Sequence, residues 1–523
     1  MTWRVYILLF LLGLGFAFGV ASFHSSAGYM DADYYYAEGL QIVSGRGLNE
    51  PFLWNYLDDP TGLPHPSHSY WMPLTSFIAG LGMRLFGQLN FPSARWPFIV
   101  IWAILPPLSA ALSFSLTSRR DLSILTGLMT VFTGYYAPFL PTTDAFGISM
   151  LLGGLFFLAI TINRPTFLGF VLGILAGFSH LTRTDGVVWL FVSIIVILYK
   201  YFIGRKRIYR SMFTCILFLS LGYLLVMGPW FARNLMTFGQ PFAPGGIRTL
   251  WLRRYDELFF YPASQLNFQN WIDSGWKAIL QTRLWALKFN IFTTLAVQGS
   301  IFLLPLILIG LWQMRGDLRI RTGLIAWGII FGVMTLVFPF AGARGGFFHS
   351  GAALQLLLWS LAPIGLETFI IWGNRHRQWK LTQSRWIFSI GMVVIIGIVT
   401  LLIVRERVIG PSLWNPIWNK QASLYNAVEQ FMLTDGVPEG TVVIVSNPPG
   451  YNAITGRPAI VIPDGDEQTV LDVAKRYGGN YLILEPNAVP RGLSSLYKNP
   501  YTHPGFEYLG SIEEVLIFEI REY

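Results

Sequence analysis

The chain has 523 residues, of which 53% are hydrophobic and only 12% are charged, and its net charge at pH 7 is +9. The charged share is about half of what soluble proteins carry, which excludes an ordinary water-soluble fold for most of the length. Lys and Arg fall mainly in short connectors between apolar runs, so the positive charge is not the binding face of a nucleic-acid-binding protein, and no nucleic-acid partner is expected.

Apolar runs recur along the first 405 residues, and runs of about 18 residues or more can cross a bilayer core of about 30 Å. The clearest apolar cores are residues 5–23, 191–202, 212–231, 291–314, 323–340 and 387–404. Residues 94–117 carry Pro106-Pro107 in the middle, and proline in a helix interior removes a hydrogen bond, so we expect two short helices there. The result is an all-α polytopic membrane bundle of about thirteen transmembrane helices.

Four basic connectors set the expected orientation of the bundle. They are residues 118–120, 204–210, 315–321 and 374–380. The positive-inside rule places them in the cytoplasm. The polar loops at 24–70 and 232–288 then face outward, as does the tail after Arg405, so the chain is predicted to be a multi-pass integral membrane protein.

The character of the sequence changes after the last apolar run. Residues 441–446, 459–463 and 480–485 are short and rich in β-branched residues, which predicts strands. Residues 468–477 have helical spacing of apolar side chains. We therefore predict a transmembrane module at 1–405 and a small soluble α/β domain at 406–523.

Acidic residues are scarce, so their positions are informative. Asp31 and Asp33 directly follow the first span, where carboxylates can accept a proton from a hydroxyl or bind a metal ion. Aspartates at a helix start also cap free backbone N–H groups, and spacing alone does not decide between these roles. Asp144 and Asp185 lie at other outward-facing span ends, where charges usually face a cavity. Arg183 beside Asp185 is equally explained as an ion pair.

Cationic side chains lie at the same predicted face. Arg233 follows a span and suits bidentate phosphate binding, although an arginine here can also reach lipid headgroups without a specific role. Arg344 and His349 form a second outward spot. His65 and His68 are three residues apart, a spacing that allows joint metal ligation on a helix, but the neighbouring prolines argue against a helix and loop histidines are commonly polar surface.

These motifs together resemble the C-type glycosyltransferases of the protein O-mannosyltransferase and aminoarabinose transferase group, which are multispanning enzymes that use polyprenyl-phosphate-linked sugars. The likeness covers essentially the whole chain. Its most specific parts are the acid-Tyr-Tyr-Ala element at 31–37, the His-Pro to Tyr-Trp-Met-Pro-Leu run at 65–74, the Pro-Trp to Arg-Asn run at 229–234, and the Thr-Gly-Arg-Pro run at 455–458. The tail resembles soluble tails of bacterial members, which implies a bacterial-type plasma membrane with the C-terminal domain outside.

The resemblance implies roles for the candidate residues. Asp31 matches the catalytic base and Asp144 the second outward acid, while Asp33 stands where the family often has another residue. Arg233 matches the lipid-phosphate side, with Arg183 or Arg344 assisting. Where aminoarabinose transferases carry Glu-Lys-Pro-Pro, this chain has Pro64-His65, so a divalent metal site of that kind requires His65 or His68 to substitute.

The implied reaction is an inverting hexosyl or pentosyl transfer from a polyprenyl-phosphate sugar to a hydroxyl of a lipid, glycan or protein. A divalent metal ion is the one cofactor under consideration. The alternative is a transporter or flippase for a lipid-linked or polar solute. That alternative is disfavoured because the charges gather at one face and not at the midplane, and because the sequence shows no inverted repeat.

Overall fold

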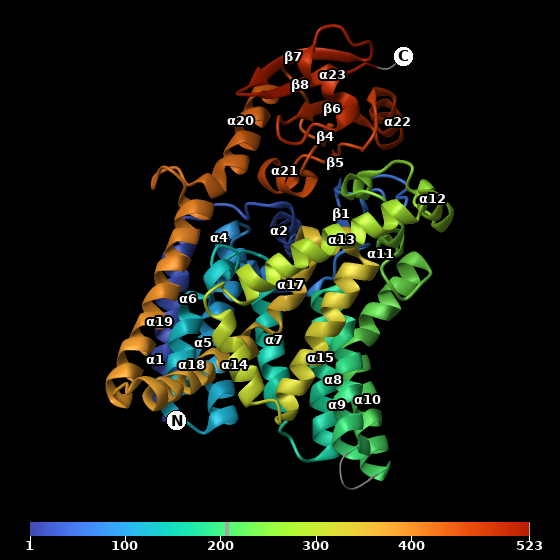
Figure 1. The fold of residues 1–523 in the computed structure, drawn as a ribbon. Coiled ribbons are helices and arrows are strands. Elements are labelled where there is room, and N and C mark those ends of the chain that lie inside the picture. The colour runs from blue at the N-terminus through green and yellow to red at the C-terminus, as the bar shows by residue number, and fades with distance from the viewer. Residues whose placement is uncertain (204–208, 522–523) are drawn as a thin grey trace.

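The computed structural model describes residues 1–203 and 209–521, and it places a helical bundle beneath a small α/β domain (Figure 1). Eight helical segments of this described part are long and apolar enough to cross a membrane. They are Trp3–Ala21 (α1), Phe91–Thr117 (α4 and α5), Pro165–Thr182 (α8), Thr184–Phe202 (with α9), Tyr209–Phe238 (α10), Leu318–Val337 (with α15), Gln355–Arg377 (α18) and Leu381–Ile409 (with α19). The predicted membrane bundle is confirmed, whereas the count of thirteen spans is not.

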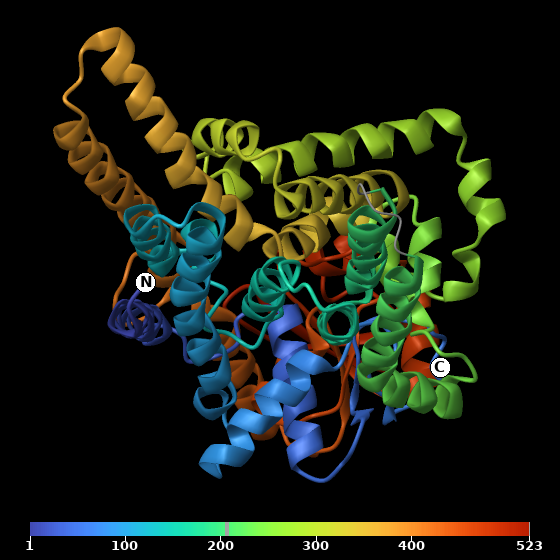
Figure 2. The same cartoon turned by 90° about the horizontal axis from the view of Figure 1, so that it is seen from below.

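Shorter helices complete the bundle and its outer loops. The apolar ones are Leu74–Phe86 (α3), Phe146–Ala159 (α7) and Leu304–Gln313 (α14). The others are Met30–Val43 (α2), Arg120–Phe132 (α6), Gly245–Arg248 (α11), Phe268–Asp273 (α12), Trp276–Thr293 (α13), Pro339–Ala341 (α16) and Phe347–Ala352 (α17). Figure 2, the view from below, shows the hairpin of α18 and α19 at one edge of the bundle. Because α10 continues to Phe238, the outer loop expected from residue 232 begins later.

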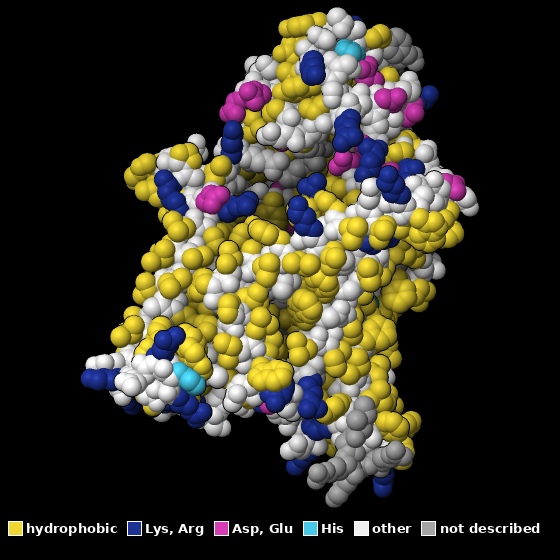
Figure 3. All heavy atoms as spheres, viewed as in Figure 1, with side chains coloured by type: hydrophobic (Ala, Val, Ile, Leu, Met, Phe, Trp, Pro, Cys, Tyr) yellow, Lys and Arg dark blue, Asp and Glu magenta, His cyan; other side chains and the backbone are white. Residues whose placement is uncertain are grey.

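The outer surface of the bundle has the character that lipid contact requires. Large apolar side chains stand exposed on several helices, among them Phe213, Leu225 and Trp386. Figure 3 shows this apolar belt, with Lys and Arg at the end farthest from the tail domain and also at the end beside it. The basic connector predicted at 204–210 lies largely outside the described residues.

The predicted break at Pro106-Pro107 is wrong. Helix α5 runs unbroken as Trp96–Thr117 with both prolines inside it. Membrane helices tolerate proline where neighbouring helices compensate. Here the ring of Pro106 packs against Gly13 of α1, only 3.0 Å from where a Cβ at Gly13 would stand. The glycine thus makes room for the proline, and the helix continues.

The tail is an α/β domain built around one six-stranded sheet, and the α/β class is the one that the sequence predicts. The strand order is β2-β5-β4-β6-β8-β7, with the first four parallel and the last two antiparallel. The strands are Phe52–Leu53 (β2), Val442–Val445 (β4), Ala459–Val461 (β5), Gly479–Leu484 (β6), Phe506–Ile512 (β7) and Val515–Ile520 (β8). The helices are Lys420–Thr434 (α20), Pro448–Thr455 (α21), Glu467–Tyr477 (α22) and Ser494–Lys498 (α23). Three of these strands coincide with predicted ones, and β2, β7 and β8 were not predicted.

Strand β2 comes from the first outer loop and not from the tail. Phe52 and Leu53 pair in parallel register with Ala459 and Ile460 of β5. The hydroxyl of Tyr56 donates to the Val461 carbonyl. The same loop forms a two-stranded ribbon from Asn49–Glu50 (β1) and His65–Pro66 (β3). The sheet therefore joins the tail to the loop that follows α1, and the division into 1–405 and 406–523 remains a prediction.

Candidate functional site

Three side chains from distant parts of the chain meet where the bundle borders the tail domain. Asp31 lies in the first turn of α2, Asp144 lies in the turn before α7, and His349 lies on α17. Nε2 of His349 is 3.2 Å from Oδ2 of Asp144 and 3.8 Å from Oδ2 of Asp31. Within the described residues these three form the group whose ligand atoms all lie within 4.8 Å of one another. Two carboxylates and an imidazole are suitable ligands for a divalent cation, so the group fits the predicted cofactor class.

Neighbouring groups hold Asp144 and His349 in place. The Tyr29 hydroxyl and the Ala145 backbone N–H both donate to the carboxylate of Asp144, which is 2% exposed. The His349 ring stacks on Phe146 with centroids 3.9 Å apart. Its Nδ1 lies 3.0 Å from the Gly345 carbonyl oxygen, which accepts the ring hydrogen. This contact leaves Nε2 directed at the two carboxylates.

The two carboxyl groups differ in their ease of ionisation. Burial raises the pKa of Asp31, and although the charge of His349 opposes this rise, the charge of Asp144 adds to it. Burial would raise the pKa of Asp144 as well, but His349 and the hydrogen bonds from Tyr29 and Ala145 lower it overall. Such separation marks a division of roles between paired acids. Asp31 is the better proton acceptor near neutral pH, and Asp144 stays ionised.

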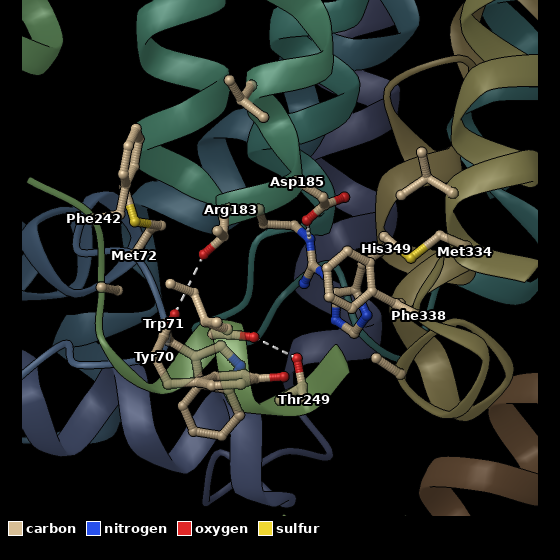
Figure 4. Close-up of a pocket in the computed structure, with 18 of the residues that line it drawn as sticks. Tyr70, Trp71, Met72, Arg183, Asp185, Phe242, Thr249, Met334, Phe338 and His349 are labelled. Carbon is tan, nitrogen blue, oxygen red and sulfur yellow. Dashed lines mark hydrogen bonds and ion pairs between the residues drawn. The ribbon is translucent and has the colours of Figure 1, made fainter. Parts of the chain in front are cut away.

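Asp31 and His349 line a cavity of about 620 Å³ between the bundle and the outer loops. One wall is apolar and comes from membrane helices, including Phe191, Ile329 and Val333. Another wall is aromatic and comes from the outer loops: Trp54, Tyr70, Trp71 and Tyr255, in which Trp54 and Trp71 stack at 3.9 Å. Figure 4 shows Arg183, Asp185 and His349 between Trp71 on one side and Phe338 on the other. Charged groups thus lie between an apolar and an aromatic region.

Arg183 and Asp185 both reach this cavity and are already paired. Nε of Arg183 donates to Oδ1 of Asp185 at 2.9 Å, and the Ser350 hydroxyl donates to the same carboxylate. Arg183 and Asp185 therefore form the ion pair that their spacing in the sequence allows. Arg183 still lies close enough to favour the charged form of Asp31.

Arg344 is the cavity cation without an acidic partner. Its guanidinium lies over the Tyr255 ring at 4.8 Å, and no carboxylate of the described chain comes within 4.0 Å of it. It stands on the glycine-rich turn Gly342–Gly346, where Gly345 has a φ of 128°, a conformation that favours glycine. An exposed guanidinium on such a turn is suited to bind an anion.

Arg233 and the two loop histidines lie elsewhere. Arg233 does not line the cavity; its Nη2 donates to the Ser67 carbonyl at 2.8 Å, and its guanidinium lies over the Trp230 ring. His65 is held between two carboxylates, and His68 faces the hydroxyls of Ser67 and Ser76. The metal site suggested for His65 and His68 is therefore not formed, because their rings bind different partners and neither belongs to the Asp31 group.

Asp33 turns away from the cavity that Asp31 faces. It is 6% exposed, and its Oδ2 accepts a hydrogen bond from Asn447 of the tail domain at 2.9 Å. Burial raises the pKa of Asp33 to about 7, against the effect of that hydrogen bond. The two aspartates therefore do not act as a pair at one site.

The comparisons with known proteins agree on the fold. No family model matches the sequence, and no curated protein sequence matches it. Among solved structures, ArnT from Cupriavidus metallidurans bound to undecaprenyl phosphate is similar at a TM-score of 0.58 and 12% identity, over 99% of this chain and 98% of that one. The Archaeoglobus fulgidus oligosaccharyltransferase complexed with Zn and sulfate gives 0.56 and 12%, over 92% and 67%.

The chain has the fold of the C-type glycosyltransferases. ArnT in its apo state is similar as well, with a TM-score of 0.54, 10% identity and coverage of 98% and 97%. The predicted resemblance is confirmed at the level of the fold, because the TM-scores of these three structures exceed 0.5.

Some residues of this site were not predicted. Tyr29 and Tyr255 contact Asp144 and Arg344, yet neither was singled out among the 23 tyrosines of the sequence. Tyr29 directly precedes the helix that carries Asp31, and this position is the one feature of the sequence that indicates its place near the site. Nothing near Tyr255 in the sequence indicates that its loop returns to the cavity.

The His65 cluster predicts a pH-dependent stability. Nδ1 of His65 is 2.9 Å from Glu50 and Nε2 is 2.7 Å from Asp58. Burial alone would lower the pKa of His65, but the two carboxylates raise it to about 10. Because this lies above the ordinary value of 6.5, the stabilisation is complete below pH 6.5 and is lost as pH rises toward 10. The melting temperature in detergent should fall across that window.

Two variants distinguish the contribution of His65 to the fall in stability from a general effect of high pH on the protein. His65→Gln should destabilise the protein at pH 6.5 by on the order of 2 kcal/mol or more, and it should flatten the decline. His68→Gln is the matched control, since burial lowers the pKa of His68 to about 3 and the ring is neutral throughout. A wild-type melting temperature that does not change between pH 6.5 and 10 would contradict this account.

Proposed function

We propose that the protein transfers a hexose or pentose from a polyprenyl-phosphate donor to an acceptor hydroxyl, with inversion, at the outer face of a bacterial-type plasma membrane. The observation that carries this is the convergence of Asp31, His349, Arg183 and Arg344 on one cavity that also has an apolar membrane wall. The shared fold with an ArnT bound to undecaprenyl phosphate supports the donor class. The acceptor is a lipid, glycan or protein hydroxyl, and the tail domain is outside.

The cavity offers each part of such a donor a matching surface. The polyprenyl chain would lie along the apolar wall that contains Phe191, Ile329 and Val333. Its phosphate would meet Arg344 first, since Arg183 already shares its charge with Asp185. The sugar would then lie toward the aromatic wall. Arg233, which the resemblance places at the phosphate, instead holds the Ser67 carbonyl, so we assign the phosphate to Arg344 with Arg183 in support.

The chemistry follows from these positions. The Asp31 carboxylate takes the proton of the acceptor hydroxyl, and the acceptor oxygen forms a bond to the anomeric carbon from the face opposite the phosphate. The carbon–oxygen bond to phosphate breaks, and polyprenyl phosphate leaves with the electron pair. Cations held at the phosphate oxygens stabilise the charge that develops there, so a general acid is not required.

A divalent metal ion is the cofactor that this site would accept. Asp144 and His349, with Asp31 beside them, are the residues that would hold it. When bound, it would supply positive charge beside the donor phosphate. Asp144 suits this role because its lowered pKa keeps it ionised. An oligosaccharyltransferase of related fold is complexed with Zn, which supports a divalent cation as the cofactor class.

Purified protein should cleave one member of a panel of polyprenyl-phosphate hexoses and pentoses. The measurement is release of free polyprenyl phosphate, with the anomeric configuration of the product read by NMR. Loss of activity with EDTA and recovery with a divalent cation would support the metal. Movement of an intact lipid-linked sugar across a vesicle membrane, without cleavage, would contradict the proposal and favour the transporter.

A further inference from the structure

The tail domain touches the helix that carries Asp31 at a buried point. Nδ2 of Asn447, in the loop after β4, donates to Oδ2 of Asp33 at 2.9 Å, and the two residues are 4% and 6% exposed. The backbone of Gly450 lies close to the side chain of Asp33, because a Cβ added to Gly450 would stand 2.7 Å from Oδ2 of Asp33. The first turn of α21 therefore rests directly on the first turn of α2.

Asn447 is itself fixed within the tail. Its Oδ1 accepts the backbone N–H of Gly450 at 3.1 Å and so caps α21. Its Nδ2 also lies 3.2 Å from Oε1 of Gln421 on α20. An amide with partners on both of its polar atoms has little freedom to rotate. The contact with Asp33 thus transmits the position of the tail domain to α2.

The same turn of α2 is also held by the Asp144 segment. The Thr143 hydroxyl donates to the Ala32 carbonyl at 2.7 Å. The first turn of α2 is therefore fixed between the turn that carries Asp144 and the tail domain. Asp31 lies on this turn, and its distance to His349 depends on both attachments.

We infer that Asn447 is a positioning residue, through which the tail domain sets the place of Asp31 relative to Asp144 and His349 by holding Asp33. The kinetic consequence rests on the proposed function, whereas the structural consequence does not. Misplacement of a reacting group by about 1 Å can cost on the order of a hundredfold in rate, so even a small shift of this turn is measurable.

The test combines kinetics with hydrogen–deuterium exchange of the full-length protein in nanodiscs. Asn447→Ala should lower kcat at least tenfold with the donor KM unchanged, and it should speed amide exchange in the first turns of α2. Asp33→Ala should do the same, and the double variant should lose no more than either single variant, because both remove one contact. Asp33→Asn keeps an accepting oxygen and should recover most of what Asp33→Ala loses.

The matched control is Asn452→Ala on the same helix α21. Its Nδ2 donates to the Arg457 carbonyl at 2.9 Å, so the substitution removes a hydrogen bond within the tail and leaves the Asn447–Asp33 hydrogen bond in place. It should leave kcat and α2 exchange unchanged. If Asn447→Ala does not fold, Asp33→Ala tests the contact from the other side. If Asn447→Ala changes neither kcat nor amide exchange in α2, the inference is overturned. If the wild-type protein transfers no sugar, only the proposed function is refuted. Amide exchange in α2 then still tests whether Asn447 positions this helix.

Discussion

Replacement of Asp31 by Asn is expected to reduce turnover on the order of a hundredfold or more while donor binding stays intact. Asn keeps the shape of the side chain but cannot accept the proton of the acceptor hydroxyl. Of Asp31 and Asp144, Asp31 is the one that lines the cavity, and burial raises its pKa, which makes it the better base of these two. Single-turnover transfer and equilibrium binding of the donor measure the two effects separately.

A matched control for Asp31→Asn is Asp256→Asn. Asp256 is exposed on the 3₁₀ turn Tyr255–Phe259, next to a residue of the cavity wall, and the same chemical change there should be silent. Asp144→Asn tests the other carboxylate and should impair metal binding together with transfer. Full activity of Asp31→Asn would refute its role as the base.

Removal of the guanidinium of Arg344 is expected to weaken donor binding and slow transfer together, with a loss of kcat/KM on the order of tenfold to a hundredfold. The same contact would hold the donor phosphate and stabilise it as it leaves. Arg344→Lys should recover part of the loss, because an ammonium supplies charge but not a planar pair of donors. Binding of polyprenyl phosphate without a sugar isolates the phosphate contact.

Arg233→Ala is the informative comparison, because the resemblance and the structure disagree about it. Arg233 holds the Ser67 carbonyl outside the cavity. Its removal should therefore lower thermal stability by on the order of 1–3 kcal/mol, with donor affinity retained. The reverse pattern, in which Arg233→Ala loses the donor and Arg344→Ala does not, would return the phosphate to Arg233.

The parts of the molecule that the sequence predicted are those fixed by local chemistry. Apolar runs report membrane helices because hydropathy is a property of each segment alone. The position of an acid at a span end is likewise a local property of the sequence, and two such acids, Asp31 and Asp144, lie in one group with His349. The unbroken helix at Pro106 was not predictable locally, since the space for its ring comes from Gly13, in a different helix.

Asp33 shows where pattern reasoning failed at the site. On a helix, side chains two positions apart do not face each other. Once residues 30–43 form α2, Asp31 and Asp33 must therefore point to different surroundings. The suggested joint metal site at His65 and His68 is absent for a related reason. The conformation of the loop, and not the spacing of the two residues, decides which groups each ring contacts. The two-residue strand β2 has no pattern of its own, and its pairing with β5 depends on a strand near the other end of the chain.

That pairing has a consequence for how the protein is made. Tyr56 and Val461, which close the sheet beside β2, are 405 residues apart in the chain. At a synthesis rate of about 5–20 residues per second, the first loop waits roughly 20–80 seconds for its partner strand to emerge. During this time residues 52–53 have no sheet to join. Conversely, a tail produced alone from residue 406 would expose the edge of β5, and unpaired edges of this kind promote aggregation.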